Sequence, residues 1–224
     1  MIKNIGPKIS KELFQRIKLV RRDMGDLLFH FTRTPNEKFV TVKAKTKEIV
    51  MPGSAYSVLK KILMEGFLTG SSRWTSSERC ICFTEAPVIE VNSIFSLVEI
   101  ASSRKERPRY EPFGIAVPKK WLFEQGGRSV IYDHPSIFDQ LPIDLKYRFV
   151  PYDPTNGIDY TWEREWRIKT NSLKLDPKYT LVVVPTSEDA FDIVYEFSDI
   201  EADYNYADGD SYIAGAYHKP KWLA

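Results

Sequence analysis

The sequence has few residues suited to metal or disulfide chemistry, with 2 cysteines and 3 histidines among 224 residues. Cys80 and Cys82 are two positions apart, so a strand would place them on one face, and this separation disfavours an unstrained disulfide bond. Two cysteines and three scattered histidines also argue against a structural zinc site. We therefore expect a reduced, cytoplasmic protein without a metal centre.

Long apolar runs and the common nucleotide-binding signatures are missing as well. No stretch approaches the roughly 18–20 apolar residues of a membrane-spanning helix, and residues 1–10 lack the apolar stretch of a signal peptide. Neither G-x-G-x-x-G nor G-x-x-x-x-G-K-[ST] occurs, so a nucleotide site would not be of the Rossmann or P-loop type. The hydrophobic share of 43% is typical of a packed globular chain. We expect one domain over residues 1–224 and no membrane partner.

Charge is distributed unevenly, although the formal net charge is +2. Residues 1–61 hold 14 Lys or Arg against 5 Asp or Glu, whereas residues 186–217 hold 9 acidic residues and no Lys or Arg. A basic end indicates an anionic partner such as nucleic acid, NAD or an acidic protein. The alternative is that the two ends neutralise each other in the fold. The acidic end could also mimic or repel nucleic acid.

Two helices have clear start and stop signals. Ser10 is expected to cap a first helix that ends at Gly25, and Ser54 precedes a second helix that ends at Gly66. The apolar face of the first helix consists of Leu13, Ile17, Val20 and Met24.

The rest of the chain predicts short strands interleaved with a few helices. Further helices are expected at residues 88–102, 118–125 and 186–195. Residues 38–50 predict a loop or an edge hairpin, and residues 69–78 a polar loop. Strands are expected at residues 27–32, 79–84, 113–117, 129–132, 145–150, 160–169, 180–184 and 211–218. Because regular βαβ spacing is missing, the expected class is α+β.

The segment from Thr161 to Ile168 carries two carboxylates one residue apart. On a strand, Glu163, Glu165 and Arg167 would share one face, and the neighbouring tryptophans would wall off water. Adjacent carboxylates can stabilise a cation, polarise a hydroxyl or act as a base. The alternative is an edge strand with cross-strand salt bridges.

Three further segments are candidates for polar chemistry. His30 and Thr32 would share a strand face and offer hydrogen bonds to a ligand, or His30 is a half-buried histidine with its bonds satisfied. Residues 70–79 combine hydroxyls, two arginines and an indole, which suits phosphate binding, although a surface loop is the alternative. Glu85 follows a strand and precedes a proline, which is equally typical of a turn.

The order in which these segments follow one another resembles that of a known protein family. A histidine strand at 28–32 is followed by a helix ending at 62–68, a strand segment at 82–87, and then by 113–117, Trp121, Gly127 and 130–132. Together they resemble the AbiGi-type abortive-infection proteins of bacterial phage defence. The wider arrangement, over roughly residues 26–170, is similar to ADP-ribosyltransferases, including the DarT-like toxins that modify nucleic acid.

The resemblance implies a fold and a cofactor. The fold would be an ADP-ribosyltransferase-like split β-sheet core with flanking helices, with an N-terminal helix in residues 1–25 and an acidic extension in residues 186–224. NAD would be the substrate. His30 would hold one of its riboses, supported by Phe31 and Thr32 on the same strand.

The resemblance also implies roles for the two carboxylates. Glu165 would be the catalytic glutamate, which bonds the nicotinamide ribose and stabilises the oxocarbenium ion that forms as nicotinamide leaves. Glu163 would activate or orient the acceptor.

Cationic and aromatic partners for NAD follow from the same resemblance. Arg73 or Arg79 would pair with the pyrophosphate, because residues 85–87 are Glu-Ala-Pro where DarT-like proteins carry an arginine. Tyr132 would stack on nicotinamide, with Trp74 and Tyr110 as alternatives.

The implied function is a mono-ADP-ribosyltransferase toxin that modifies nucleic acid, with RNA or DNA favoured over protein, and that is silenced by an antitoxin protein. One alternative is a non-catalytic antitoxin or sensor with the same fold. Others are a protein-targeting transferase and a phosphate-transferring enzyme that acts on RNA ends.

Overall fold

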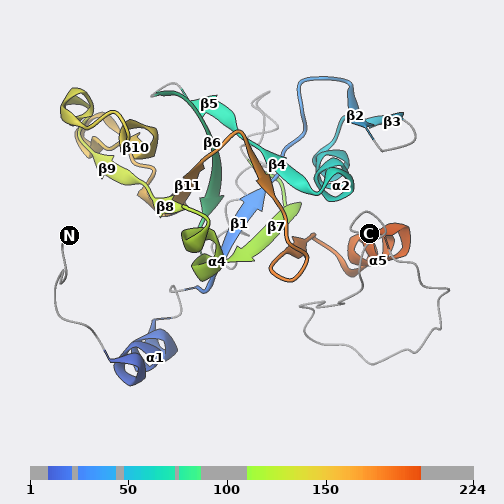
Figure 1. Ribbon diagram of the computed structural model, residues 1–224, viewed down its shortest axis with the longest axis horizontal. Helices are drawn as coiled ribbons and strands as arrows, with labels where there is room; N and C mark the ends of the chain where they lie inside the picture. The colour runs from blue at the N-terminus through green and yellow to red at the C-terminus, as the bar shows by residue number, and fades with distance from the viewer. Residues whose placement is uncertain (1–9, 22–24, 44–47, 74–75, 87–109, 198–224) are drawn as a thin grey trace.

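The computed structural model describes residues 10–21, 25–43, 48–73, 76–86 and 110–197 (Figure 1). A seven-stranded antiparallel sheet forms its centre. The strand order is β13 (Leu181–Val183), β7 (Gly114–Pro118), β1 (Leu27–Phe31), β6 (Ser76–Thr84), β11 (Glu165–Lys169) and β8 (Arg128–Ser129), with β5 (Ser71–Arg73) paired to β6. Together with the helices, this sheet confirms the α+β class.

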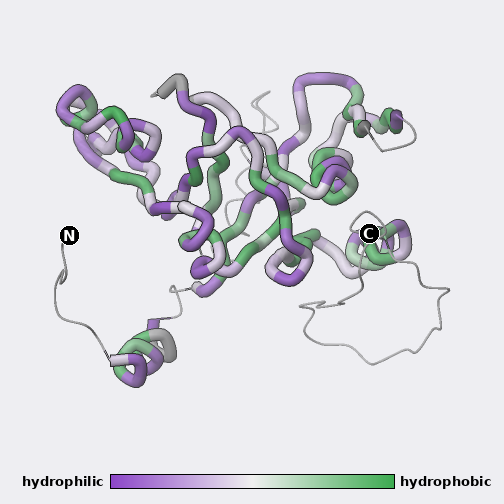
Figure 2. The backbone as a smooth tube through the Cα atoms, viewed as in Figure 1, coloured by the Kyte–Doolittle hydropathy of each residue, from purple (hydrophilic) through white to green (hydrophobic). Residues whose placement is uncertain are grey.

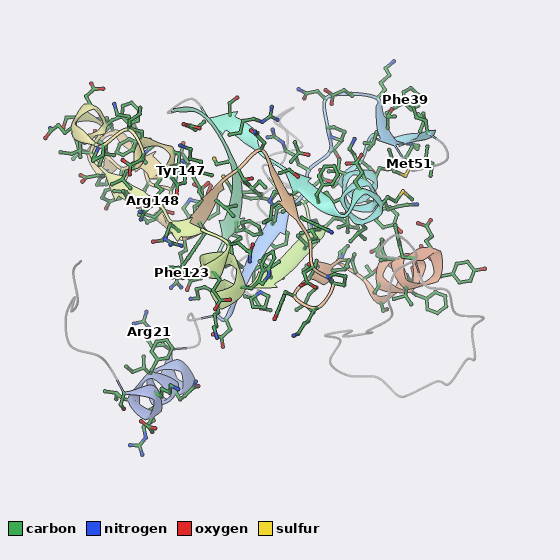
Figure 3. The ribbon with its side chains drawn as sticks, in the orientation of Figure 1. Arg21, Phe39, Met51, Phe123, Tyr147 and Arg148 are labelled. Atoms are coloured by element: carbon green, nitrogen blue, oxygen red, sulfur yellow. The ribbon has the colours of Figure 1, made fainter. Side chains whose placement is uncertain are left out.

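Three small sheets lie around the central one. The hairpin of β2 (Phe39–Lys43) and β3 (Glu48–Pro52) and the pair of β4 (Phe67–Thr69) and β12 (Ser172–Lys174) are antiparallel. The pair of β9 (Ile131–Asp133) and β10 (Phe149–Pro151) is parallel. Figure 3 shows Phe39 and Met51 on the β2–β3 hairpin and Tyr147 and Arg148 on the other side of the sheet, near β10.

Local signals explain where the helices begin and end. Ser10 caps α1 (Lys11–Val20), and its hydroxyl accepts from the amide of Leu13 at 3.1 Å. Ser54 caps α2 (Ala55–Glu65), which ends at the left-handed Gly66. The other helices are α4 (Lys119–Glu124), α5 (Ser187–Phe197) and the 3-10 turns η1 (Pro135–Gln140), η2 (Lys146–Arg148), η3 (Pro154–Asn156) and η4 (Thr161–Glu163).

One face of the sheet carries the hydrophobic core, to which α2 and α5 add side chains. The green, hydrophobic stretches of Figure 2 run through the central strands and the inner side of α2. The buried members include Leu28, Leu59, Leu63, Ile81, Phe83, Ile115, Val117, Ile168 and Ile193.

The other face of the sheet is more polar. Strand pairing places Glu165 opposite Thr84 and Arg167 opposite Cys82, so these four side chains share this face. Phe29 of β1 joins them through its pairing with Thr84. Glu165 and Arg167 of this polar face belong to the candidate site, whereas His30 alternates with Phe29 and pairs with Ile115, on the face of the core.

Several expected elements differ from the structure. The first helix ends at Val20 instead of Gly25, and residues 38–50 contain the hairpin that was one of the two expectations. The polar loop expected at residues 69–78 is wrong for residues 71–73 and 76–78, which lie in the paired strands β5 and β6. The strand expected at 145–150 begins at Phe149, after η2. The elements expected at 88–102 and 211–218 lie outside the described residues.

Candidate functional site

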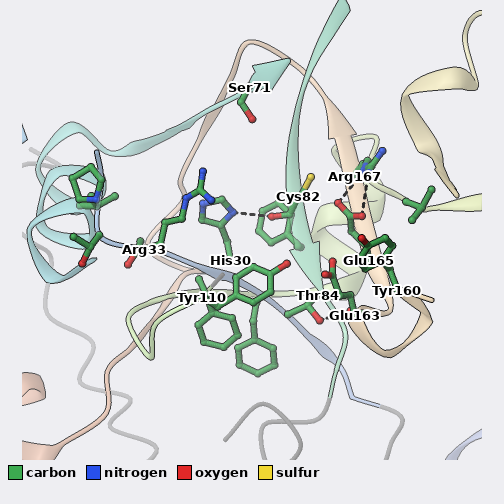
Figure 4. A pocket seen from close by; sticks show the side chains of 18 of the residues that line it. His30, Arg33, Ser71, Cys82, Thr84, Tyr110, Tyr160, Glu163, Glu165 and Arg167 are labelled. Carbon is green, nitrogen blue, oxygen red and sulfur yellow. Dashed lines mark hydrogen bonds and ion pairs between the residues drawn. The ribbon is translucent and has the colours of Figure 1, made fainter. Parts of the chain in front are cut away.

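A pocket of about 1020 Å³ lies beside the pairing of β1 with β6 and is lined by residues of both strands (Figure 4). Its walls come from β1 and the residues after it, β6, β10, η4, β11 and Tyr110. Small-molecule sites typically enclose about 300–1,000 Å³, so this pocket has room for a ligand of dinucleotide size. It brings together His30, Phe31, Thr32, Glu163 and Glu165, which the sequence had singled out.

Glu165 is the first residue of β11 and is held by an arginine of the same strand. Both of its carboxylate oxygens accept from Arg167, from Nε and from an Nη atom, at 2.9 Å each. Both side chains are largely buried: that of Arg167 is 9% exposed and that of Glu165 is 10% exposed. The sequence correctly predicted that these two residues share a strand face.

Arg167 is itself anchored to the main chain. Its other terminal nitrogen donates to the carbonyls of Tyr147 at 2.8 Å and Phe149 at 3.1 Å. Burial lowers the pKa of Arg167, but the hydrogen bonds and the charge of Glu165 outweigh burial and raise that pKa overall. The Glu165 carboxylate is therefore fixed in one orientation by a permanently charged partner.

Glu163 reaches the pocket from a turn and not from a strand. The strand expected at 160–169 is wrong for its first half, because residues 161–163 form η4 and Arg164 adopts a left-handed conformation with φ 45°. Glu163 is nevertheless buried, with 4% exposure, and lines the pocket beside Glu165. The tryptophans do not wall the pocket: Trp162 is 42% exposed, and Trp166 packs against the core.

Tyr132 supports Glu165 from behind the pocket. Its hydroxyl accepts from the amide of Glu165 at 3.0 Å, and its ring is not part of the pocket wall. The pKa of Tyr132 is raised to about 12, mainly by burial and further by the charges of Glu165 and Glu163. The hydrogen bond from the Glu165 amide lowers this pKa, but by less than burial raises it. The expected stacking role does not fit this position. Tyr110, an alternative of the sequence analysis, and Tyr160, which it missed, are tyrosines of the pocket wall.

His30 bridges two neighbouring strands at the pocket. β1 and β6 pair at Phe29 and Thr84, and the imidazole Nδ1 of His30 lies 2.7 Å from the carbonyl oxygen of Cys82 on β6. That bond fixes the orientation of the ring at the pocket. Cys82, next to this bond, lines the pocket, and no disulfide joins it to Cys80.

Thr32 lies just past β1 and is tied to main-chain carbonyls. Its hydroxyl is 2.8 Å from the carbonyl oxygen of Ala55 and 3.0 Å from that of Phe113, and the side chain is 4% exposed. A hydroxyl has one proton, so Thr32 can offer a ligand only an acceptor. Its main contribution is to join the end of β1 to the start of α2.

Besides Arg167, the pocket wall contains an arginine that the sequence analysis missed. Arg33 lines the pocket three residues after His30, and Figure 4 shows it on the side of the pocket away from the labelled carboxylates. Arg79 is instead exposed and donates to the carbonyl of Gly70 at 2.8 Å, outside the pocket wall. The side chain of Arg73 and the residue Trp74 lie outside the described part of the chain. The sequence does hold one signal for Arg33, because this cation follows the candidate histidine His30 by three residues.

Comparisons with known proteins give no relative for this chain. No protein-family model, no curated protein and no solved structure matches it. Within the described ranges, no group of three or more metal-ligating side chains comes together. In the same ranges, no helix has the length and apolar character needed to cross a bilayer. The pocket geometry therefore carries the functional argument.

Proposed function

We propose that this chain is an NAD-dependent mono-ADP-ribosyltransferase whose active site is this pocket. The observation that carries the proposal is the meeting of His30, Glu163 and Glu165 in one large pocket with a cation, Arg33, across from the two carboxylates. These side chains come from segments more than a hundred residues apart in the sequence. A dinucleotide such as NAD needs such a combination, because it has a diphosphate at its centre and, at the nicotinamide end, the glycosidic bond that is to be broken.

The antiparallel sheet supports the same proposal at the level of the fold. An ADP-ribosyltransferase-like core would have a sheet that opens beside the early histidine. In support of this, the pairing register of β1 with β6 is the single pair of Phe29 with Thr84, and beside it the His30 side chain, not the main chain of β1, contacts the carbonyl of Cys82.

The proposed reaction breaks the bond between the nicotinamide nitrogen and the ribose anomeric carbon. Nicotinamide leaves with the bonding electron pair, and the positive charge develops on the ribose. Glu165 would bond the ribose 2′-hydroxyl and stabilise this charge, since a carboxylate fixed before the reaction stabilises a nearby cation without reorganisation. Glu163 would take the proton of the acceptor group as that group forms the new bond to the anomeric carbon.

Recognition of NAD would fall to the other wall residues. Arg33 would pair with the diphosphate, the role that the sequence had given to Arg73 or Arg79. His30 would bond a ribose hydroxyl, and Tyr110 or Tyr160 would stack on the nicotinamide ring.

The biological setting follows from the resemblance to phage-defence proteins. The proposed role is a cytoplasmic toxin that modifies nucleic acid, with RNA slightly favoured, and that a partner antitoxin holds inactive. The basic first quarter of the chain suits a polyanionic acceptor.

Nicotinamide release from NAD, in the presence of total cellular RNA, DNA and protein, tests the proposal. Glu165→Gln and Glu163→Gln should each lower the rate by roughly 10²–10³. Glu124→Gln is the matched control, because Glu124 lies on the surface with a 58% exposed side chain and should leave the rate unchanged. Equal rates for Glu165→Gln and wild type would overturn the assignment.

A second candidate is a nucleotide-binding sensor without catalysis. The favouring observation is that Arg167 engages both oxygens of Glu165, which leaves the pair with no net charge to stabilise a cation. This candidate predicts tight NAD binding by calorimetry with no release of nicotinamide.

A further inference from the structure

The carboxylate of Glu85 lies at the centre of a contact cluster just outside the pocket. Glu85 follows β6, and its side chain is 12% exposed. One of its oxygens lies 2.5 Å from Nζ of Lys119, at the start of α4, and 3.8 Å from the guanidinium of Arg164. The other oxygen accepts from the indole nitrogen of Trp166 at 2.9 Å. The cluster therefore links the end of β6 to α4, to Arg164 just before β11, and to Trp166 within β11.

Glu85 contacts the segment that contains both pocket carboxylates, Glu163 at the end of η4 and Glu165 at the start of β11. Arg164 stands between Glu163 and Glu165 and, among the described residues, is the non-glycine residue with a positive φ. A left-handed conformation costs free energy in an L-residue with a side chain, so it persists where surrounding contacts enforce it. Such residues cluster at functional sites.

The main chain of the same turn is held from β6. The amide of Glu85 donates to the carbonyl of Arg164 at 3.2 Å, and the hydroxyl of Thr84 donates to the carbonyl of Glu163. Glu85 does not line the pocket, so any effect it has on a ligand must pass through the turn.

We propose that Glu85 is a positioning residue that enforces the left-handed turn at Arg164 and thereby aims Glu163 and Glu165 into the pocket. Its side chain holds Arg164 and Trp166 at once, and these residues flank Glu165 in the sequence. The catalytic consequence rests on the proposed function, whereas the structural consequence does not.

Kinetics of nicotinamide release provide the first test. Glu85→Ala removes all three side-chain contacts and should lower kcat by roughly 10- to 100-fold with little change in KM, since a misplacement of about 1 Å can cost 10²-fold. Glu85→Gln keeps an acceptor for Trp166 and loses both charge contacts, so it should fall between wild type and Glu85→Ala. Glu124→Ala is the control, because it removes an exposed glutamate that pairs with Lys120 at 3.9 Å.

A double-mutant cycle separates positioning from general stability. If Glu85 acts through Glu163, then Glu85→Ala should lower kcat far less in a Glu163→Gln background than in wild type. The same fold-reduction in both backgrounds, measured well below the melting temperature of each variant, would overturn the proposal.

A crystal structure of the Glu85→Ala variant tests the proposal without any activity. We expect Arg164 to leave its positive φ and the Glu163 carboxylate to leave the pocket. An unchanged turn with both carboxylates in place would overturn the positioning role. If the wild type releases no nicotinamide, the proposed function fails, and this structure still decides the role of Glu85.

Discussion

At the residue scale, the pocket carboxylates depend on neighbours that never touch a ligand. Arg167 fixes the Glu165 side chain through two bonds of 2.9 Å, and Tyr132 fixes its main-chain amide at 3.0 Å. A Glu165 carboxylate held in this way loses little freedom when a substrate arrives, which is what preorganised catalysis requires.

Tyr132→Phe should destabilise the protein most at neutral pH and less in alkali. The variant loses the acceptor for the Glu165 amide, at a cost of about 1–3 kcal/mol. The folded-state pKa of Tyr132 rises from 10.0 to about 12, so the unfolded chain loses this proton first, and the phenol's contribution is lost as the pH climbs from about 10 to 12. Urea unfolding between pH 8 and 11 measures this, and a stability difference from wild type that stays constant would contradict it.

Arg33→Ala should raise the KM for NAD by about 10-fold or more with little change in kcat. A charge-assisted hydrogen bond contributes about 1.5–3 kcal/mol, and a diphosphate contact far from the reacting carbon is equally strong in the ground and transition states. Initial rates over a range of NAD concentrations measure this. Lys120→Ala, which removes an 88% exposed cation from α4, is the control. If the KM of Arg33→Ala equals that of Lys120→Ala, Arg33 does not bind the diphosphate.

At the element scale, the close pairing of β7 with β1 holds the histidine in place. Gly114 of β7 pairs with Phe31, and a Cβ at this glycine would lie 2.3 Å from the carbonyl oxygen of His30. The two strands can approach this closely because position 114 has no side chain.

Gly114→Ala should therefore push β1 away from β7 and move His30. We expect a loss of about 1–3 kcal/mol in the free energy of unfolding, together with weaker NAD binding. Gly25→Ala is the control, because a Cβ there would come no closer than 3.7 Å to its neighbours. Urea unfolding and calorimetry measure both effects, and equal stability of the two variants would contradict the expectation.

The elements that the sequence predicted well are those with local signals. The α2 helix runs between its Ser54 cap and Gly66 as expected, because a side-chain cap and a left-handed glycine act within a few residues. The turn at Arg164 could not be predicted, because contacts from Thr84 and Glu85, some eighty residues away in the chain, enforce it.

The same distinction applies to the site residues. The E-x-E spacing and the strand histidine identified Glu163, Glu165 and His30, all of which line the pocket. The sequence distinguishes Arg33 only by its place three residues after His30, and the fold is what selects it over Arg79.

At the scale of the whole molecule, the α1 helix lies apart from the body that carries the pocket. Figure 1 shows α1 apart from the sheet, and the described side chains of residues 11–16 are all exposed. The main-chain carbonyl of Asp26 accepts from the amide of Lys119 at 2.7 Å, so the packed body begins by that residue.

Deletion of residues 1–25 should weaken binding to single-stranded RNA without changing the affinity for NAD. Each lost phosphate contact makes the negative slope of log K against log salt shallower by about 0.7 for a single strand. Fluorescence anisotropy with a labelled RNA at several salt concentrations measures this slope. An RNA affinity and slope equal to those of the full chain would show that the acceptor surface lies elsewhere.

The most direct test of the central claim is transfer of label from NAD. The purified chain is incubated with NAD labelled in its adenosine part and with total cellular RNA, DNA and protein, which are then separated and counted. We predict label in a nucleic-acid fraction, lost with Glu165→Gln and kept with Glu124→Gln. No label in any fraction and no free nicotinamide would contradict the transferase assignment and leave the binding candidate in its place.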